Sequence, residues 1–252
     1  MNFQGLGRPL NDEDMDAACQ LLKAADPDVW AVLTVETRGF GFLQDKRPQI
    51  LFERHVFHRL TDGKYDDVDS NISNPIQGGY TGGSGEYDRL NKAIILNEDK
   101  ALQSTSWGIG QVMGFNFKSA GFPSVSEMVI SMIEDEKSQL MAVANFIAAM
   151  GLASALQRQN WVAFARKYNG PSFRDNEYDT RLAAAYAKFN VKLPDLHLRA
   201  AQAALFYLGI DPGPIDGFRG RRTTSALLEF QANSGLNQSG FLDQDTSSAL
   251  GL

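Results

Sequence analysis

The sequence is poor in the residues that cross-link chains or bind soft metals. Its 252 residues contain one cysteine, Cys19, and three histidines, at positions 55, 58 and 197. One cysteine excludes an intrachain disulfide and a zinc site made of cysteines, and three histidines could supply only a sparse metal site. We therefore expect no metal and no cofactor.

An excess of positive charge is also missing. The net charge is −6 at pH 7, whereas a protein that binds nucleic acid normally carries a basic surface, so nucleic acid is not an expected partner. The sequence has no run of about 18 apolar residues, and its N-terminus lacks a basic start followed by an apolar segment. We expect neither a membrane span nor a signal peptide, and hence a soluble protein made in the cytosol.

The composition that remains is that of a globular protein, with 43% hydrophobic and 21% charged residues. The length exceeds that of a common single domain, and the linker-like segment Asn190–Pro194 divides the chain into predicted domains over 1–190 and 195–252. Residues 40–90 are rich in turn signals and predict loops with a small hairpin. Apolar residues at helical spacing predict helices over 15–25, 27–38, 88–104, 108–118, 125–150, 152–157, 160–168, 177–189, 198–208 and 223–231, with a short turn at Leu250.

Glu36 is the most informative residue. It occupies the last turn of a predicted helix that should stop at Gly39. The negative end of the helix dipole and the apolar neighbours both disfavour a carboxylate there, so both should raise its pKa. A carboxyl group with a raised pKa can act as a general acid. The alternative is a solvated glutamate paired with Arg38.

Two further segments carry polar groups that suit a sugar. Gln111 follows Gly108 and Gly110, which would let a ligand approach the backbone, and its amide offers a donor and an acceptor. Tyr168 and Asn169, at the end of a predicted helix, suit hydroxyl and N-acetyl groups. The alternatives are a helix packing contact for the first segment and ordinary turn chemistry for the second.

A third group lies in the region of loops. Glu53 and His55 would share a face if 49–57 is a strand, and they could then position a water or a sugar opposite Glu36. Equally, they could only hold the hairpin. The pair could suggest a metal, but a third ligand is missing. Tyr80 lies between two pairs of glycines, so we expect it in an exposed loop, where it could act as an aromatic platform.

Taken in order, these motifs resemble the N-acetylmuramidase domain of phage endolysins, within the lysozyme-like superfamily. The resemblance covers about residues 10–190 and rests on four segments: Glu36–Phe42, Arg47–His55, Ser106–Gly108 and Phe164–Pro171. It implies a mainly α, lysozyme-like fold with a small hairpin region. At Gly110 relatives usually carry a bulky residue, which predicts a different local wall of the cleft.

The resemblance also implies a chemistry. The enzyme would cleave peptidoglycan between N-acetylmuramic acid and N-acetylglucosamine, with Glu36 as general acid. Gln111, Tyr168 and Asn169 would hold the sugar. Two alternatives stay open: a lytic transglycosylase that forms anhydro-muramic products, and a non-catalytic wall-binding phage protein. A single well-placed carboxylate suffices for the former, whereas Glu36 argues against the latter.

Residues 195–252 resemble the small helical peptidoglycan-binding domain of wall hydrolases. They contain two similar half-units, with Gln202 in the first and Gln231 in the second, although the final turn Gly240–Asp243 departs from the usual pattern. A three-helix domain of this kind would keep the enzyme on an insoluble polymer. Residues 1–192 should then fold alone and keep the chemistry.

The resemblance finally implies a biological setting. The protein would be a monomer made in the host cytoplasm that acts on the wall in the periplasm. Because no signal peptide is seen, a separate membrane-permeabilising protein would have to give it access. The expected outcome is lysis of the host cell.

Overall fold

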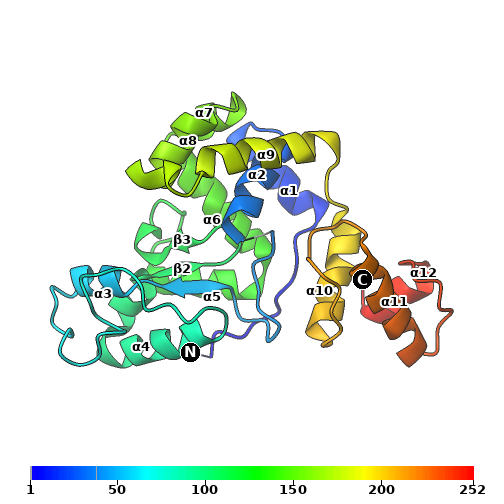
Figure 1. The fold of residues 1–252 in the computed structure, drawn as a ribbon, viewed down its shortest axis with the longest axis horizontal. Coiled ribbons are helices and arrows are strands. Elements are labelled where there is room, and N and C mark those ends of the chain that lie inside the picture. Colours follow the sequence, from blue (N-terminus) through cyan, green and yellow to red (C-terminus); the bar gives the residue numbers. More distant parts are fainter. Residues whose placement is uncertain (1, 38) are drawn as a thin grey trace.

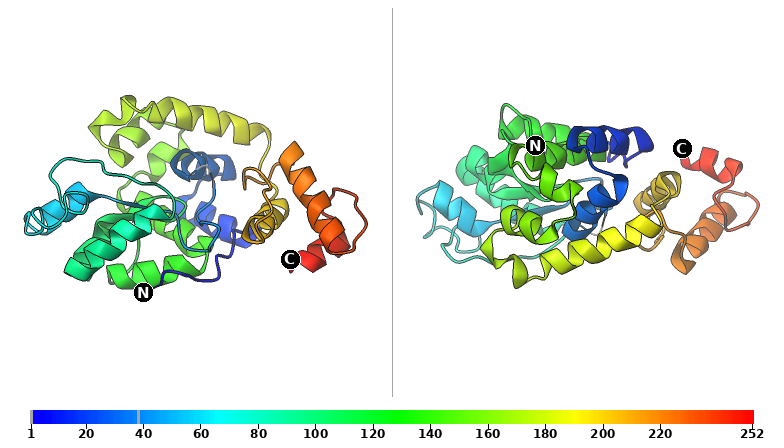
Figure 2. Two further views of the ribbon diagram at one scale, coloured as in Figure 1. Left: turned by 60° about the horizontal axis from the view of Figure 1, so that its bottom comes forward. Right: turned by 90° about the horizontal axis from the view of Figure 1, so that it is seen from above.

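The computed structural model describes residues 2–37 and 39–252, without the side chains of residues 36, 37, 171 and 172. This described part of the chain forms twelve α-helices and one three-stranded sheet, which confirms the mainly α prediction (Figure 1). The tail of the chain, from α10 (Leu196–Tyr207) to α12 (Gln244–Leu250), lies to one side of the other elements, and α10 is the tail helix nearest to them (Figure 2).

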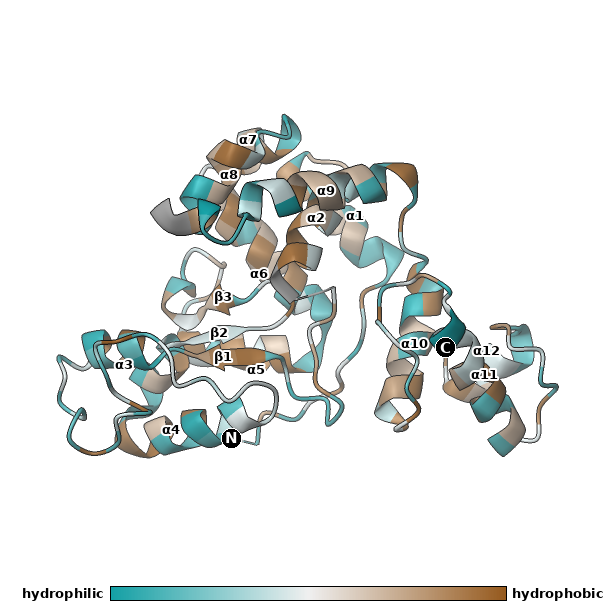
Figure 3. Ribbon diagram, in the orientation of Figure 1, coloured by the Kyte–Doolittle hydropathy of each residue, from teal (hydrophilic) through white to brown (hydrophobic). Residues whose placement is uncertain are grey.

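The first two helices are α1 (Asp12–Leu22) and α2 (Asp26–Thr37). Asn11 caps α1 in a capping box. Its side chain accepts a hydrogen bond from the backbone N–H of Asp14, and the side chain of Asp14 accepts one from the backbone N–H of Asn11. Residues 29–33 of α2 are at most 3% exposed, so this helix runs through the core. In Figure 3, α2, α6 (Glu136–Ala149) and the first strand (Ile50–Phe52) are coloured as hydrophobic segments.

The sheet is antiparallel, in the order β1 (Ile50–Phe52), β2 (Thr105–Trp107) and β3 (Val112–Met113). The predicted helix over 108–118 is wrong, because this segment forms the turn into β3 and a short 3-10 helix η1 (Gly114–Asn116). The reason is local backbone geometry. Gly108 (φ +68°) and Gln111 (φ +47°) are both left-handed, and such residues reverse the chain into a hairpin.

A strand over 49–57 is also wrong. The strand ends at Phe52, and α3 (Arg54–Leu60) begins directly after Glu53. The apolar positions 56, 57 and 60 have helical spacing, which overrides the period of a strand. Glu53 and His55 therefore do not alternate along a strand but lie at the start of a helix.

The long helix predicted over 125–150 is two helices, α5 (Val125–Glu134) and α6 (Glu136–Ala149). Asp135 between them is extended, and its side chain caps α6. The N-terminal segment lies beside this break. The backbone N–H of Arg8 donates to the carbonyl of Glu134, and the carbonyl of Arg8 accepts from the N–H of Glu136. A hydrogen bond with a segment over 120 residues away thus interrupts a pattern that is helical in the local sequence.

The remaining elements of the larger domain follow the sequence prediction closely. The long α4 (Gly85–Gln103) packs against β1, and α9 (Tyr178–Val191) packs along α2. The final elements of this domain are α7 (Ala153–Gln157), α8 (Trp161–Tyr168), the 3-10 helix η2 (Pro171–Arg174) and α9 (Tyr178–Val191). In the described part of the chain, no helix is long and apolar enough to cross a membrane.

The tail consists of α10 (Leu196–Tyr207), α11 (Arg221–Asn233) and α12 (Gln244–Leu250). The two half-units use the same device. Gln202 of α10 accepts the backbone N–H of Gly217 at 2.8 Å, and Gln231 of α11 accepts that of Gly240 at 2.9 Å. Each buried glutamine therefore fixes the loop that follows its own helix. This shared contact explains why the two half-units are similar in sequence.

The tail is packed against the first domain. Phe40 and Phe42 are buried together with Ala203 and Ile215 of the tail. The structure buries these phenylalanines in the seam between the two parts of the chain. The loop that follows α2 is consequently shared by both.

Candidate active site

The end of α2 carries Glu36, whose side chain lies outside the described part of the structure, as does all of Arg38, its alternative partner. The backbone on both sides of Glu36 is fixed. The carbonyl of Val35 accepts a hydrogen bond of 2.9 Å from Arg181 of α9. The N–H of Gly41 donates to Glu136 of α6 at 2.8 Å, and the carbonyl of Gly39 accepts from Arg199 of α10.

The loop after Glu36 lies directly against the turn between β2 and β3. A side chain at Gly41 would place its Cβ 2.0 Å from Oε1 of Gln139 and 3.0 Å from the backbone nitrogen of Ile109. Gln139 is buried, and it accepts from the N–H of Ile109 at 2.7 Å. Close approach of the two backbones therefore requires glycine at position 41. Sequence reasoning missed Gln139, whose only signal is a polar residue beside the apolar stripe of α6.

Gly110 is explained by the same packing. A Cβ at this position would lie 1.9 Å from Cγ2 of Val143 on α6. A bulky residue could not fit without moving α6 or the turn. The turn and α6 are therefore too close for a side chain at position 110.

Gln111 holds the turn together. Its amide nitrogen donates to the carbonyl of Gly108 at 2.9 Å and to that of Gln49 at 3.2 Å. Its amide oxygen accepts from the hydroxyl of Ser106 at 2.8 Å. These contacts give Gln111 a positioning role. Its predicted contact with the sugar stays a prediction.

The structure brings Tyr168 to this turn. The hydroxyl of Tyr168, the last residue of α8, lies 3.4 Å from the carbonyl of Gly110. Its ring stacks on Phe164 at 5.2 Å and meets the edge of Phe146 at 5.5 Å. Asn169 follows as the C-cap of α8. Two predicted segments thus meet in space, although 58 residues separate Gly110 from Tyr168.

The third predicted group also forms a cluster. Tyr80 donates to Oε2 of Glu53 at 2.8 Å, and Nδ1 of His55 lies 3.1 Å from the same oxygen. Gln77 donates to the hydroxyl of Tyr80 at 2.9 Å. Burial and the bond to Glu53 raise the pKa of Tyr80 to about 12, so its hydroxyl stays a donor at neutral pH. With 42% of Tyr80 exposed, the cluster reaches the surface.

Glu86, which sequence reasoning did not select, anchors the loop that carries Tyr80. It is fully buried at the start of α4. Its carboxylate accepts from the N–H groups of Thr81 at 2.6 Å, Gly82 at 3.0 Å and Phe52 at 3.2 Å. It also pairs with Arg89 at 2.6 Å. The loop is thereby fixed to β1, next to Glu53.

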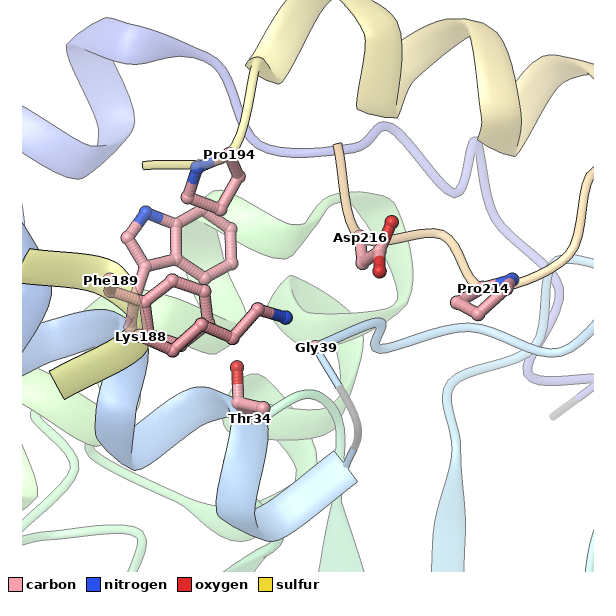
Figure 4. A pocket seen from close by; sticks show the side chains of 8 residues that line it. Thr34, Gly39, Lys188, Phe189, Pro194, Pro214 and Asp216 are labelled. Carbon is pink, nitrogen blue, oxygen red and sulfur yellow. The ribbon is translucent and has the colours of Figure 1, made fainter. Parts of the chain in front are cut away.

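Two further properties of this region concern metal binding and a pocket. Among the described residues, no three His, Cys, Asp or Glu side chains are grouped so that they could hold a metal ion. A pocket of about 180 Å³ opens in the seam near the end of α2, and Figure 4 shows Thr34, Lys188 and Asp216 around it. These three side chains belong to α2, α9 and the loop after α10, so both parts of the chain line the pocket.

Comparison with known proteins identifies the family of this chain. The N-acetylmuramidase family matches residues 26–190, and a putative peptidoglycan binding domain matches residues 197–250. The crystal structure of the Burkholderia AP3 phage endolysin is similar, with a TM-score of 0.67 and 38% identity, over 73% of this chain and 72% of that chain. No curated protein matches the chain. The chain therefore belongs to the N-acetylmuramidase family and is a peptidoglycan hydrolase of the muramidase type.

Proposed function

We propose that the enzyme cleaves the glycan between N-acetylmuramic acid and N-acetylglucosamine, with Glu36 as the general acid. The observation that carries this proposal is the backbone frame around Glu36, in which Val35, Gly39 and Gly41 are each bonded to a different helix. Such a frame holds one helix end in a single geometry. Preorganised geometry of this kind is what proton transfer to a leaving oxygen requires.

Glu36 in its acid form gives its proton to the glycosidic oxygen as an oxocarbenium-like transition state develops. Glu53 is our candidate for the second carboxylate, which would activate the attacking water. Tyr80 and His55 support this role, because both approach the same carboxylate oxygen and so orient it. Gln111, Tyr168 and Asn169 hold the sugar in this proposal.

The products test the proposal. Purified peptidoglycan is digested, and the soluble fragments are read by mass spectrometry for reducing muramic ends or anhydro-muramic ends. Reducing muramic ends are expected, since an oriented second carboxylate favours attack by water. Reducing N-acetylglucosamine ends would refute the assigned bond, and anhydro ends would show a lytic transglycosylase instead.

We further propose that residues 1–190 carry the chemistry and that residues 195–252 hold the enzyme on the wall as a monomer. Access to the wall would depend on a separate protein that permeabilises the membrane. Cells that express this chain should then lyse only when a membrane-disrupting agent is added. Lysis without the agent would contradict that dependence.

A further inference from the structure

We propose that Arg199, which belongs to the peptidoglycan-binding domain, is a positioning residue for the reaction. It fixes the segment that follows Glu36, so that the wall-binding domain completes the active site in addition to tethering the enzyme. This inference rests on the proposed role of Glu36.

The contacts of Arg199 cross the seam between the domains. Both terminal nitrogens of its guanidinium donate to the carboxylate of Glu136, at 2.6 and 2.8 Å. One of these nitrogens also donates to the carbonyl of Gly39. Neither Arg199 nor Glu136 has any exposed surface. The planar fork of arginine suits this double contact, and the ammonium of lysine cannot reproduce it.

Glu136 also forms hydrogen bonds with two more segments. Its Oε1 accepts from the N–H of Gly41 at 2.8 Å, and its Oε2 accepts from the N–H of Leu10 at 2.9 Å. The buried pair therefore joins α10 to the N-terminal segment and to both ends of residues 39–41. Because the two charges are removed from water, each depends on the other for its stabilisation.

The same guanidinium also contacts aromatic rings before and after Glu36. Its central carbon lies 5.6 Å from the ring centre of Trp30 on α2 and 5.3 Å from that of Phe40. Phe40 packs in turn on Ala203 of α10. Arg199 thus contacts α2 six residues before Glu36 and the loop four residues after it.

The seam has room for this segment to move once the arginine is lost. Trp30 and Gly39, both contacts of Arg199, line the 180 Å³ pocket together with Pro214 of the tail (Figure 4). Without the donor on its carbonyl, Gly39 could shift into that space and carry the end of α2 with it. Misplacement of a reacting group by about 1 Å can cost about 100-fold in rate.

The experiment uses the full-length Arg199→Ala protein on soluble peptidoglycan fragments, so that wall binding is not limiting. We expect kcat to fall by about 10- to 100-fold while KM changes little. Millimolar guanidinium ions should restore part of kcat, because the truncated side chain leaves space for the missing group. The matched control is Arg222→Ala, an exposed arginine of α11 that pairs with Asp211, and it should keep the kcat of the parent enzyme.

A second variant covers the case in which Arg199→Ala does not fold. The double change Glu136→Gln with Arg199→Met removes both buried charges together, which costs less than removing one partner alone. Its thermal midpoint should lie above that of Arg199→Ala, and its kcat should still fall, since Gly39 has lost its donor. Arg199→Lys should behave likewise.

The inference is overturned if folded Arg199 variants keep the parent kcat. It is also overturned if kcat falls only in proportion to the unfolded fraction and guanidinium restores nothing, because that would show a merely structural role. The proposed role of Glu36 fails separately, through an active Glu36→Gln protein, and the two failures therefore cannot be confused.

Discussion

The hydroxyl of Tyr80 donates to Oε2 of Glu53 at 2.8 Å, across 27 positions of sequence. This bond ties an exposed loop to the residue that directly follows β1 and precedes α3. It gives the second carboxylate of the proposed mechanism a fixed orientation and a donor that does not ionise near neutral pH.

Glu53→Gln should lower kcat on soluble fragments by at least about 100-fold if this carboxylate activates the water. Tyr80→Phe should lower kcat by about tenfold only, because one hydrogen bond worth about 1.5 kcal/mol is lost while the carboxylate remains. Steady-state kinetics check both values. Parent-like kcat in Glu53→Gln would leave this residue with the role of holding the loop.

Glu36→Gln should lower lysis of bacterial walls by at least about two orders of magnitude, since the amide keeps the shape but has no acidic proton to give. Its thermal midpoint should equal that of the parent or exceed it slightly. Turbidity assays and thermal unfolding give the two values. An active Glu36→Gln protein refutes the assignment.

The seam alters what we expect of a truncated chain. From the sequence, we expect residues 1–192 to fold without the tail and to keep the catalytic activity. The structure shows that truncation removes Arg199, leaves the buried Glu136 without its partner and exposes Phe40 and Phe42. Loss of one partner of a buried pair costs about 3–5 kcal/mol. Urea unfolding should show a loss of this order, and kcat should fall with it.

A single substitution provides the control for that truncation. Glu136→Gln should destabilise the full chain, in which Arg199 then lacks its counter-charge. In the truncated chain the same change should cost less stability, because no buried Arg199 is then left without its counter-charge. Equal losses in both chains would contradict our account of the seam.

Acid should loosen the loop of Tyr80. Burial raises the pKa of Glu86, but the N–H groups of Gly82 and Thr81 and the Arg89 guanidinium outweigh it and lower the pKa from its usual 4.5. A lowered folded pKa adds stability that is fully present above the unfolded pKa and is lost as pH falls through the folded one. Stability should therefore decline below about pH 4.5.

Hydrogen exchange at pH 5 and pH 3 locates this effect. Amides of residues 80–84 should lose protection at pH 3 more than those of α6. Glu86→Gln should be less stable at pH 7 and should respond less to acid. The exposed Glu98→Gln on the same helix should behave as the parent does. A Glu86→Gln protein that loses stability in acid as the parent does would contradict the role of Glu86 in holding this loop.

Cys19 should react slowly. Burial and its bond to Asp26, at 3.3 Å, raise the pKa of its thiol to about 12. Since the thiolate is the reactive form, iodoacetamide at pH 8 should modify the folded protein at least about 100-fold more slowly than the urea-unfolded protein. Asp26→Asn should speed the reaction in the folded state. Equal rates in folded and unfolded protein would contradict the raised pKa.

Local signals in the sequence were enough to predict much of the fold. The apolar stripe that leads to Glu36 predicts α2, and the repeated glutamines at 202 and 231 predict the paired half-units of the tail. Each depends on residues close together in the chain. The N-acetylmuramidase assignment also follows from such local motifs, and the family comparison confirms it.

Long-range partners explain the errors. The helix pattern over 125–150 is interrupted at Asp135 because Arg8 bonds to the backbone on both sides of it. Arg199 is invisible to sequence reasoning for the same reason: Glu136 lies 63 residues away and looks like an ordinary surface acid beside Lys137. Nothing in the local sequence shows that both become buried.

The contact between Gly7 and Tyr207 has a consequence for the order of folding. The hydroxyl of Tyr207 donates to the carbonyl of Gly7 at 2.7 Å, across 200 positions. Contacts of such separation form late, because the chain between them must first be ordered. Docking of α10 is thus expected to be the last step of folding. During synthesis the enzyme would remain immature until that helix has left the ribosome.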